Sequence, residues 1–243
     1  MLDPADDFAV CASLEGVPSA LAATRDGIDA LLLDRGLRRT TAGLTAESLL
    51  RGALASATLA GSTATEQEVR AGVGDPVAVA AARLYAGLPS LVPVIGRSPL
   101  QALARLHSLA APPQTAPDQV GRPRDDLRAT ARLQALSRQL VAPTQAPALA
   151  VAALAHAEVA ALQPFASANG LVARAVERLL LVGRGVDPTA LTVPEGGHLA
   201  MGEAYREALA AYAEGSLEGR RRWLLYAATA LTTGVSLSPL LSR

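Results

Sequence analysis

Segments rich in Ala and Leu follow one another along almost the whole chain, separated by short stretches containing Gly or Pro. Ala and Leu are strong helix formers, whereas strands favour β-branched and aromatic residues. Aromatic residues make up only 3% of the 243 positions, and half of all residues are hydrophobic. A chain of this length and apolar content can bury a large core. The sequence therefore predicts a mainly α protein, built as one large domain or as one domain with a helical arm.

Helix start and stop signals mark out the individual helices. Apolar residues recur with helical spacing in residues 17–39, and Arg38 and Arg39 suit the C-terminal end of a helix there. Asp75 followed by Pro76 is typical of an N-cap and a first helical position. We expect a further helix to begin at this pair.

We expect a second helix between these two, with a hydroxyl residue at its start and a glycine at its end. Thr45 or Ser48 is expected to cap it, and Gly61 is expected to end it. Further helices are expected over residues 100–109, 127–141, 146–162 and 169–182, with two more in the C-terminal 43 residues.

Two segments depart from this helical pattern. Residues 88–99 (LPSLVPVIGRSP) have β-like character interrupted by proline, so we expect a short β-like segment there. Residues 111–126 (APPQTAPDQVGRPRDD) contain four prolines and are expected to form a long irregular loop. Long loops in compact domains are usually functional or disordered.

Charge and cysteine content exclude several functional classes. The 22 basic and 22 acidic residues balance, so the chain lacks the excess positive charge that nucleic-acid binding requires. Cys11 is the only cysteine, which excludes an intrachain disulfide and a cysteine-based zinc site. The acidic N-terminus does not resemble a signal peptide, and the longest apolar run, residues 146–162, is short for a membrane span. We expect a cytoplasmic protein that binds neither nucleic acid nor membrane.

Residues 163–174, QPFASANGLVAR, form a polar interruption before a new apolar run. Ser167 and Asn169 are both suitable N-caps for a following helix, and Gly170 allows the backbone to approach a ligand closely. A helix N-terminus attracts anions, and the Arg174 guanidinium suits phosphate oxygens. The alternative is an ordinary capped helix with Arg174 in a surface ion pair.

The same residues resemble the signature of the Fic (Fic/Doc) family, H-P-F-x-[DE]-G-N-G-R-x-x-R. The positions that match are Pro164, Phe165, Asn169, Gly170 and Arg174. Fic enzymes transfer AMP or related phosphate-containing groups to protein hydroxyls. The resemblance implies a Fic-like helical bundle over residues 45–230, with residues 1–44 as an N-terminal helical extension and 231–243 as a tail.

Two further segments are similar to elements of the same family, in the expected order. LARLHSL, which contains His107, and VGRPR, which contains Arg122 and Arg124, resemble the Leu-His helix and the flap that aligns the substrate. In that setting the two arginines could face the pocket; otherwise they are solvated charges in a mobile loop.

ASATLAG at residues 55–61 is similar to the inhibitory motif [ST]-x-x-x-E-[GN] of the family. Ser56 and Gly61 match this motif, but Ala60 replaces its glutamate. The resemblance implies that this segment no longer blocks the γ-phosphate. That fits a protein with no activity to inhibit, and it equally fits a pocket that is always open.

The catalytic positions of the motif are replaced. Gln163 stands where the family has its histidine base, and a neutral amide cannot accept a proton at pH 7. Loss of general base catalysis costs about 10²–10⁴-fold in rate. Ser167 replaces the magnesium-binding acid, Ala168 a glycine, and Leu171 the first arginine. No metal ligand is therefore predicted.

Another histidine could supply the missing base. His198, in the segment VPEGGHL, is the candidate substitute; the alternative is an exposed loop histidine, and Glu195 beside it is a weak metal ligand. His156 lies two helical turns before Gln163 and is expected to be a packing residue. His107 is expected to fix a helix by hydrogen bonding.

Three functions remain open on these residues. The first is a catalytically impaired Fic-fold protein that acts as an interaction or anion- and nucleotide-binding module. The second is an altered transferase that moves AMP or another phosphate-containing group. The third is a helical scaffold without ligand. ATP or another nucleotide with Mg²⁺ is the cofactor that the resemblance implies, and an unidentified protein or a second copy of the chain is the partner. The residues expected to hold phosphate are Ser167, Asn169, Gly170 and Arg174.

Overall fold

The computed structural model describes residues 6–33 and 41–241 of the chain. Its helices are α1 (Asp7–Ala12), α2 (Val17–Leu32), α3 (Thr41–Leu59), α4 (Glu66–Ala71), α5 (Pro76–Ile95), α6 (Pro99–Ala110), α7 (Leu127–Val141), α8 (Ala148–Leu162), α9 (Asn169–Gly183), α10 (Pro194–Met201), α11 (Glu203–Ala213) and α12 (Leu217–Ser236). The described residues contain no strand, which confirms the mainly α prediction. Arg38 and Arg39, expected to end the first helix, lie outside the described residues.

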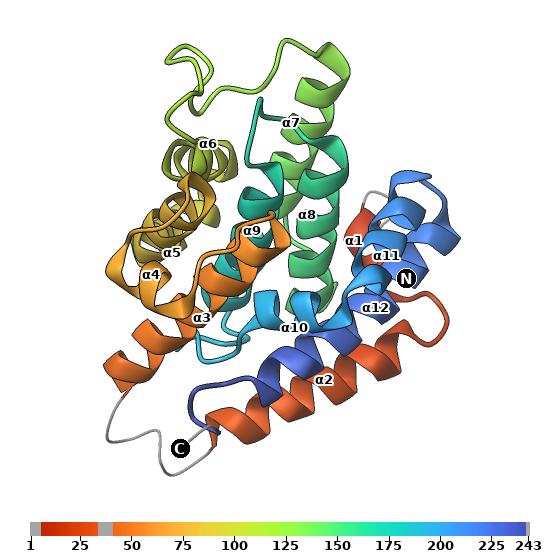
Figure 1. Ribbon diagram of the computed structural model, residues 1–243. Coiled ribbons are helices and arrows are strands. Elements are labelled where there is room, and N and C mark those ends of the chain that lie inside the picture. The colour runs from red at the N-terminus through yellow and green to blue at the C-terminus, as the bar shows by residue number, and fades with distance from the viewer. Residues whose placement is uncertain (1–5, 34–40, 242–243) are drawn as a thin grey trace.

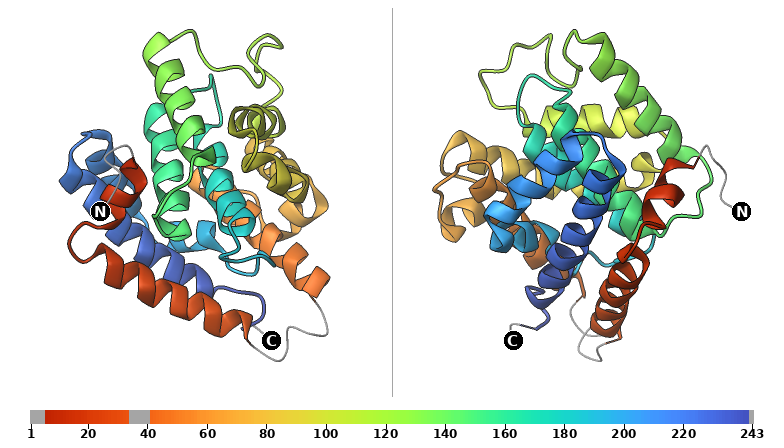
Figure 2. Two further views of the ribbon diagram at one scale, coloured as in Figure 1. Left: turned by 180° about the vertical axis from the view of Figure 1, so that it is seen from behind. Right: turned by 90° about the vertical axis from the view of Figure 1, so that its right-hand side faces the viewer.

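Helices α8 and α9 pack against each other at the centre of the molecule (Figure 1). Helices α3, α5 and α6 contact α9 on one side of this pair. On the other side α11 and α12 contact α8, and α2 runs beside α12 (Figure 2). The loop of residues 163–168, called the motif loop below, joins the two central helices.

The composition of α8 and α9 explains why they occupy the centre. Residues 149–157 of α8 are all buried, as expected of a helix that is apolar on every face. Residues 171–181 of α9 are also all buried, and they include the charged side chains of Arg174, Glu177 and Arg178. Buried charges require polar partners, so the interior contains a hydrogen-bonded network as well as an apolar core.

Residues 88–95, the greater part of the predicted β-like segment, are helical. They form the C-terminal half of α5, with Pro89 and Pro93 inside the helix. Each internal proline removes a backbone hydrogen bond and costs about 3 kcal/mol. The buried side chains of Leu88, Leu91 and Ile95 pack in the core and offset this cost.

Helix α5 is also the one helix in the described residues that is long and apolar enough to cross a membrane. In the structure it packs against α3, α6 and α9.

The predicted caps are partly right. Asp75 caps α5 by accepting hydrogen bonds from the backbone N–H groups of Val77 and Ala78, each 2.9 Å long. Thr45 and Ser48 are not caps, because α3 begins at Thr41 and includes both. Their hydroxyls instead donate to carbonyl oxygens in the segment before α10, at Thr189 (2.7 Å) and Thr192 (2.8 Å). Thr45 and Ser48 therefore make tertiary hydrogen bonds rather than caps.

The N-terminal helices share the core of the rest of the chain. Phe8 of α1 and Val17, Leu21 and Ile28 of α2 belong to the same apolar cluster as α8, α9 and α12. The expected division after residue 44 falls inside α3, and that after residue 230 falls inside α12. On α12, Trp223 is fully buried and donates its indole N–H to the carbonyl of Ala153 at 2.8 Å.

Candidate functional site

The motif loop begins and ends with residues in the left-handed region of backbone space. Gln163 has φ of 46° and Ala168 has φ of 54°. This region is unfavourable for residues with a Cβ atom, at about 1 kcal/mol or more per residue. The two residues reverse the chain direction between α8 and α9, so the loop keeps a sharply turned shape without glycine at either position.

Asn169 fixes the interior of the motif loop. Its Oδ1 accepts the N–H of Phe165, and its Nδ2 donates to the carbonyl of the same residue, both at 2.9 Å. The predicted capping roles of Asn169 and Ser167 are wrong: the residue at the N-cap is Ala168, and no side chain caps α9. Asn169 lies inside the first turn, where its side chain reaches back to the loop.

His107 of α6 packs against the motif loop. Its ring stacks on Phe165 with ring centroids 4.3 Å apart and an interplanar angle of 7°. Its Nδ1 accepts the N–H of Gly121 at 2.9 Å, while its Nε2 lies 3.4 Å from Ser167 Oγ. Burial lowers the pKa of His107, so the ring is neutral at pH 7. His107 therefore links the irregular segment 111–126 to the motif loop, in the fixing role expected from the sequence.

One arginine of the flap-like segment is held against the backbone of the motif loop. Arg124 donates its backbone N–H to the carbonyl of Pro164 at 2.7 Å and its Nε to that of Gln163 at 2.8 Å. It thus satisfies carbonyl groups of the motif loop after the end of α8. Arg122 is exposed. Neither side chain lines the cavity at the start of α9.

A cavity of about 360 Å³ opens where α9 begins, and we call it the motif cavity. Its lining residues are Leu59, Ala60, Pro76, Val77, Ala80, Ala110, Pro112, Gln163, Ala168, Asn169, Gly170, Leu171 and Arg174. The polar side chains among them belong to Gln163, Asn169 and Arg174, and the set contains no carboxylate. The cavity is therefore apolar on one side and bounded on the other by a helix N-terminus.

Arg174 lies at the base of this cavity with only 3% of its surface exposed. Its Nε donates to Ser56 Oγ at 2.8 Å and its Nη2 to the carbonyl of Ser56 at 3.0 Å. A longer contact of 3.4 Å joins Nη1 to the Tyr205 hydroxyl. The alternative of a surface ion pair is wrong, because Arg174 is buried and its guanidinium is hydrogen-bonded to α3.

Residues 55–61, the segment that is similar to the inhibitory motif, reach the motif cavity at Leu59 and Ala60. Ser56 is buried on α3, Ala60 follows the last residue of that helix and lines the cavity, and Gly61 turns the chain with φ of 90°. A longer acidic side chain at position 60 would enter the cavity on the side of Arg174. With alanine there, that space is free.

The residues of the motif cavity do not fit Mg²⁺. Magnesium sites use carboxylates beside phosphate oxygens, and the cavity lining supplies no carboxylate. Ser167 does not line the cavity, because its hydroxyl lies 3.2 Å from Thr115 Oγ1 and 3.4 Å from His107 Nε2. We therefore derive no magnesium-dependent step for this chain.

The other candidate bases lie in the interior. His198 was expected in a loop, but it belongs to α10 and is fully buried. Its Nδ1 is 2.9 Å from the Tyr226 hydroxyl and its Nε2 is 2.7 Å from Glu177 Oε2. His156 is also fully buried, as expected of a packing residue. Neither histidine lines the motif cavity, so the substitute-base role of His198 has no geometric support.

Glu195 is the partner of Arg178 rather than a neighbour of His198 in a metal site. The two side chains form a buried, two-pronged ion pair, with Nε to Oε1 at 2.9 Å and Nη2 to Oε2 at 2.6 Å. Ser48 Oγ accepts a further hydrogen bond from Nη1 at 3.2 Å. This pair joins α9, α10 and α3.

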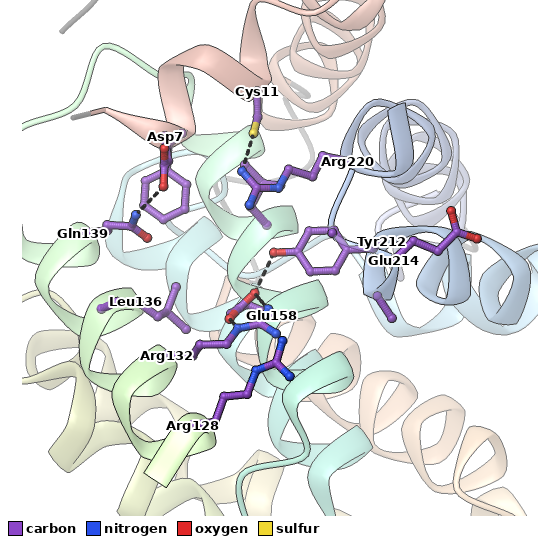
Figure 3. Close-up of a pocket in the computed structure, with 15 residues that line it drawn as sticks. Asp7, Cys11, Arg128, Arg132, Leu136, Gln139, Glu158, Tyr212, Glu214 and Arg220 are labelled. Atoms are coloured by element: carbon purple, nitrogen blue, oxygen red, sulfur yellow. Dashed lines mark hydrogen bonds and ion pairs between the residues drawn. The ribbon is translucent and has the colours of Figure 1, made fainter. Parts of the chain in front are cut away.

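A second cavity of about 360 Å³ lies between α1, α7, α8 and the turn that joins α11 to α12 (Figure 3). In it Arg132 forms a two-pronged ion pair with Glu158, at 2.8 and 2.7 Å, and the Tyr212 hydroxyl donates to the same carboxylate at 2.9 Å. Arg220 points at Cys11 Sγ, 3.7 Å away (Figure 3). Burial raises the pKa of Cys11 although Arg220 opposes the shift, so the thiol is protonated at pH 7.

The arrangement of α3, α5, α6, α8 and α9 around the motif loop is the Fic fold. A Fic family protein from Desulfovibrio desulfuricans matches with a TM-score of 0.71 at 18% identity, over 90% of this chain and 73% of that protein. Fic-1 from C. elegans matches with a TM-score of 0.62 at 16% identity, over 90% and 71% of the two chains. In sequence comparisons no protein-family model matches the chain, and no curated protein sequence matches it.

The chain is thus a Fic-fold protein, and at these identities the likeness establishes the fold alone. Function has to be argued from the site. The sequence did not point to Glu177, which interrupts the apolar run of α9, or to Tyr205, which contacts Arg174. A carboxylate between the apolar runs 175–176 and 179–181 is the signal that could have identified Glu177 as a partnered interior charge.

Proposed function

We propose that this protein is a catalytically impaired Fic-fold module that binds a phosphate-containing ligand in the motif cavity. The observation that carries the proposal is the composition of that cavity, which combines a helix N-terminus and Arg174 with no histidine and no carboxylate. Such a site attracts an anion but lacks a base to activate a hydroxyl. Its volume of about 360 Å³ lies within the range typical of small-molecule sites.

The first turn of α9 supplies the anion-binding groups. The first N–H groups of a helix have no intrahelical acceptor, and the helix dipole adds a partial positive charge there. Gly170 keeps this turn accessible, since a Cβ at that position would lie 3.3 Å from Arg174 Nη1. Phosphate oxygens can accept from these backbone groups while an apolar portion of the ligand packs on Leu59 and Val77.

Calorimetric titration with ATP and with inorganic phosphate tests this proposal. We expect one binding site for ATP, with an affinity that changes little when EDTA replaces Mg²⁺, because no carboxylate in the cavity holds the metal. Absence of heat with ATP, CTP, GTP and phosphate would contradict the proposal and would favour a scaffold that acts through protein contacts alone.

A matched pair of substitutions at the cavity edge locates the ligand. Ala60 is exposed and lines the cavity, so a longer side chain is tolerated there. Ala60→Glu places a negative charge beside the bound anion and should weaken ATP binding at least tenfold. Ala60→Gln has nearly the same size without the charge and should change the affinity much less. Equal affinities for the two variants would place the ligand elsewhere.

An altered transferase is the second candidate, and the exposed side chain of Gln163 at the cavity favours it. There the amide could orient a target hydroxyl without accepting its proton. Incubation of the protein with labelled ATP and a protein extract should give no labelled product if the first proposal holds. Labelling that disappears in Gln163→Ala would favour the transferase. For either function, we predict that the partner is another protein or a second copy of the chain.

A further inference from the structure

Three polar side chains form a closed cluster beneath α9, outside the motif cavity. They are His156 of α8, Glu177 of α9 and His198 of α10, and each is fully buried. Glu177 Oε2 lies 3.0 Å from His156 Nδ1 and 2.7 Å from His198 Nε2. We call these residues the two-histidine cluster.

The cluster has the donor set of a metal site. One nitrogen from each histidine and one carboxylate oxygen lie within 4.8 Å of one another. Two ligands bound at about 2.0–2.1 Å to a tetrahedral zinc ion lie roughly 3.3 Å apart. The observed nitrogen–oxygen distances of 3.0 and 2.7 Å are therefore a few tenths of an ångström shorter than a bound ion requires, and small side-chain rotations supply the difference.

Each imidazole is hydrogen-bonded to a tyrosine hydroxyl through the ring nitrogen that does not face Glu177. The second nitrogen of His156 lies 2.8 Å from the Tyr205 hydroxyl, and that of His198 lies 2.9 Å from the Tyr226 hydroxyl. Metal-binding histidines characteristically use the other ring nitrogen in a hydrogen bond that fixes the orientation of the ring. Both rings thus present a fixed nitrogen toward Glu177.

Glu177 carries the observation that points to a ligand. Its Oε1 is buried and has no hydrogen-bond partner in the structure. A buried carboxylate oxygen without a partner is costly, so the carboxylate has capacity for one more interaction. A cation bound by both oxygens of Glu177 and by the two histidine nitrogens would have four ligands and would satisfy Oε1.

We propose that the two-histidine cluster is a structural site for a divalent transition-metal ion, with Zn²⁺ as the best fit to its two nitrogen ligands and one carboxylate. The site joins α8, α9 and α10, and its burial closes it to substrate. Because all three side chains are fully buried, the ion would enter during folding. This site is independent of the anion site proposed for the motif cavity.

The test uses the full-length chain without a polyhistidine tag. The protein is unfolded in denaturant that contains a chelator, and the chelator is then removed. It is refolded with one equivalent of Zn²⁺ or without metal, passed through a desalting column and analysed by mass spectrometry for zinc. We expect about one zinc per chain and a higher thermal midpoint than for the metal-free protein. Fewer than about 0.1 equivalents of zinc, with identical midpoints, would overturn the proposal and leave a hydrogen-bonded cluster only.

The third histidine of the chain provides the matched control. His198→Gln should retain at least tenfold less zinc, whereas His107→Gln, at the motif loop, should retain the wild-type amount. If His198→Gln fails to fold, Co²⁺ replaces Zn²⁺ in the wild-type protein. An intense visible absorption of tetrahedral Co²⁺ supports the site, and the spectrum of free aqueous Co²⁺ contradicts it.

Discussion

Ala168 shows how a single residue shapes the candidate site. Its φ of 54° lies in the left-handed region, where a Cβ atom is unfavourable. Glycine adopts this region without a steric penalty, whereas alanine does not. The loop is therefore strained at this point.

Ala168→Gly should relieve this strain. We expect stabilisation by about 0.5 kcal/mol, because relief of roughly 1–2 kcal/mol exceeds the greater entropy of glycine in the unfolded chain. The control is Ala173→Gly, five residues further along the chain and inside α9, where the backbone is helical and the side chain buried. It should destabilise the protein by about 1 kcal/mol or more. Urea unfolding followed by circular dichroism measures both, and the same sign for both would contradict the argument.

The ion pair between Arg178 and Glu195 is the second feature at this scale. Both side chains are buried, and the pair is joined by two short hydrogen bonds. Removing one partner of a buried pair leaves an uncompensated charge. Removal of either partner should therefore lower the free energy of unfolding.

Glu195→Ala should destabilise the protein by about 3–5 kcal/mol for this reason. Glu203, which pairs with Arg206 on the surface of α11, provides the control. Glu203→Ala should change stability by about 0.5 kcal/mol or less, since exposed ion pairs contribute little. Comparable losses of stability in the two variants, measured by urea unfolding, would show that burial does not govern the effect.

The sequence identified the motif positions but not their contacts. Asn169 was a reasonable cap by residue type, yet its side chain bonds Phe165, because the loop doubles back and brings that backbone within reach. His156, Glu177 and His198 lie on three different helices, so their proximity depends on tertiary packing that local patterns do not encode. The same holds for Ser56 and Arg174, which are 118 residues apart.

Helices were well predicted where local signals agreed with burial. The predicted helix over residues 127–141 is α7, and the pair Asp75-Pro76 begins α5 as expected. The prediction of a β-like segment was wrong because its two internal prolines argued against a continuous helix, whereas burial of the segment against α9 favoured continuation of the helix. Local preference and tertiary packing disagreed there, and packing prevailed.

Helices α10 and α12 approach each other closely at Gly197. A Cβ atom built on Gly197 would overlap the carbonyl oxygen of Ala230, which is backbone and cannot rotate away. The absence of a side chain therefore sets the distance between the two helices. It also fixes the position of α10, which carries both Glu195 and His198.

Gly197→Ala should destabilise the protein by about 2–3 kcal/mol through this overlap. Gly27→Ala, in the interior of α2, is the matched control because no atom lies within 4 Å of the added Cβ. The control should be neutral or stabilising by up to about 1 kcal/mol, since alanine favours helix over glycine. Thermal unfolding compares the two, and a stable Gly197→Ala protein would show that α10 can shift.

At the scale of the whole molecule, the N-terminal helices share an apolar core with the rest of the described residues. Helix α2 buries Val17, Leu21 and Ile28, and Thr24 Oγ1 donates to the carbonyl of Ala228 on α12 at 3.0 Å. Helix α4, in contrast, has six residues, of which Val69 alone is buried. These two elements should therefore differ in how they open.

Hydrogen exchange followed by mass spectrometry measures this difference. Amides of α2 should exchange as slowly as those of α12, because both are exposed only by global unfolding. Amides of α4 should exchange at least tenfold faster through local opening. Fast exchange confined to α2 would instead define an independent N-terminal arm, the alternative that the sequence left open.

Trp223 is the only tryptophan of the chain, and it lies against the polar interior. Its ring centroid is 5.2 Å from that of His156 and 6.2 Å from that of His198. The protein consequently contains its own fluorescent reporter beside the side chains proposed to bind the metal ion. Emission from this one indole, excited selectively over the four tyrosines, can follow events in the interior in real time and without a label.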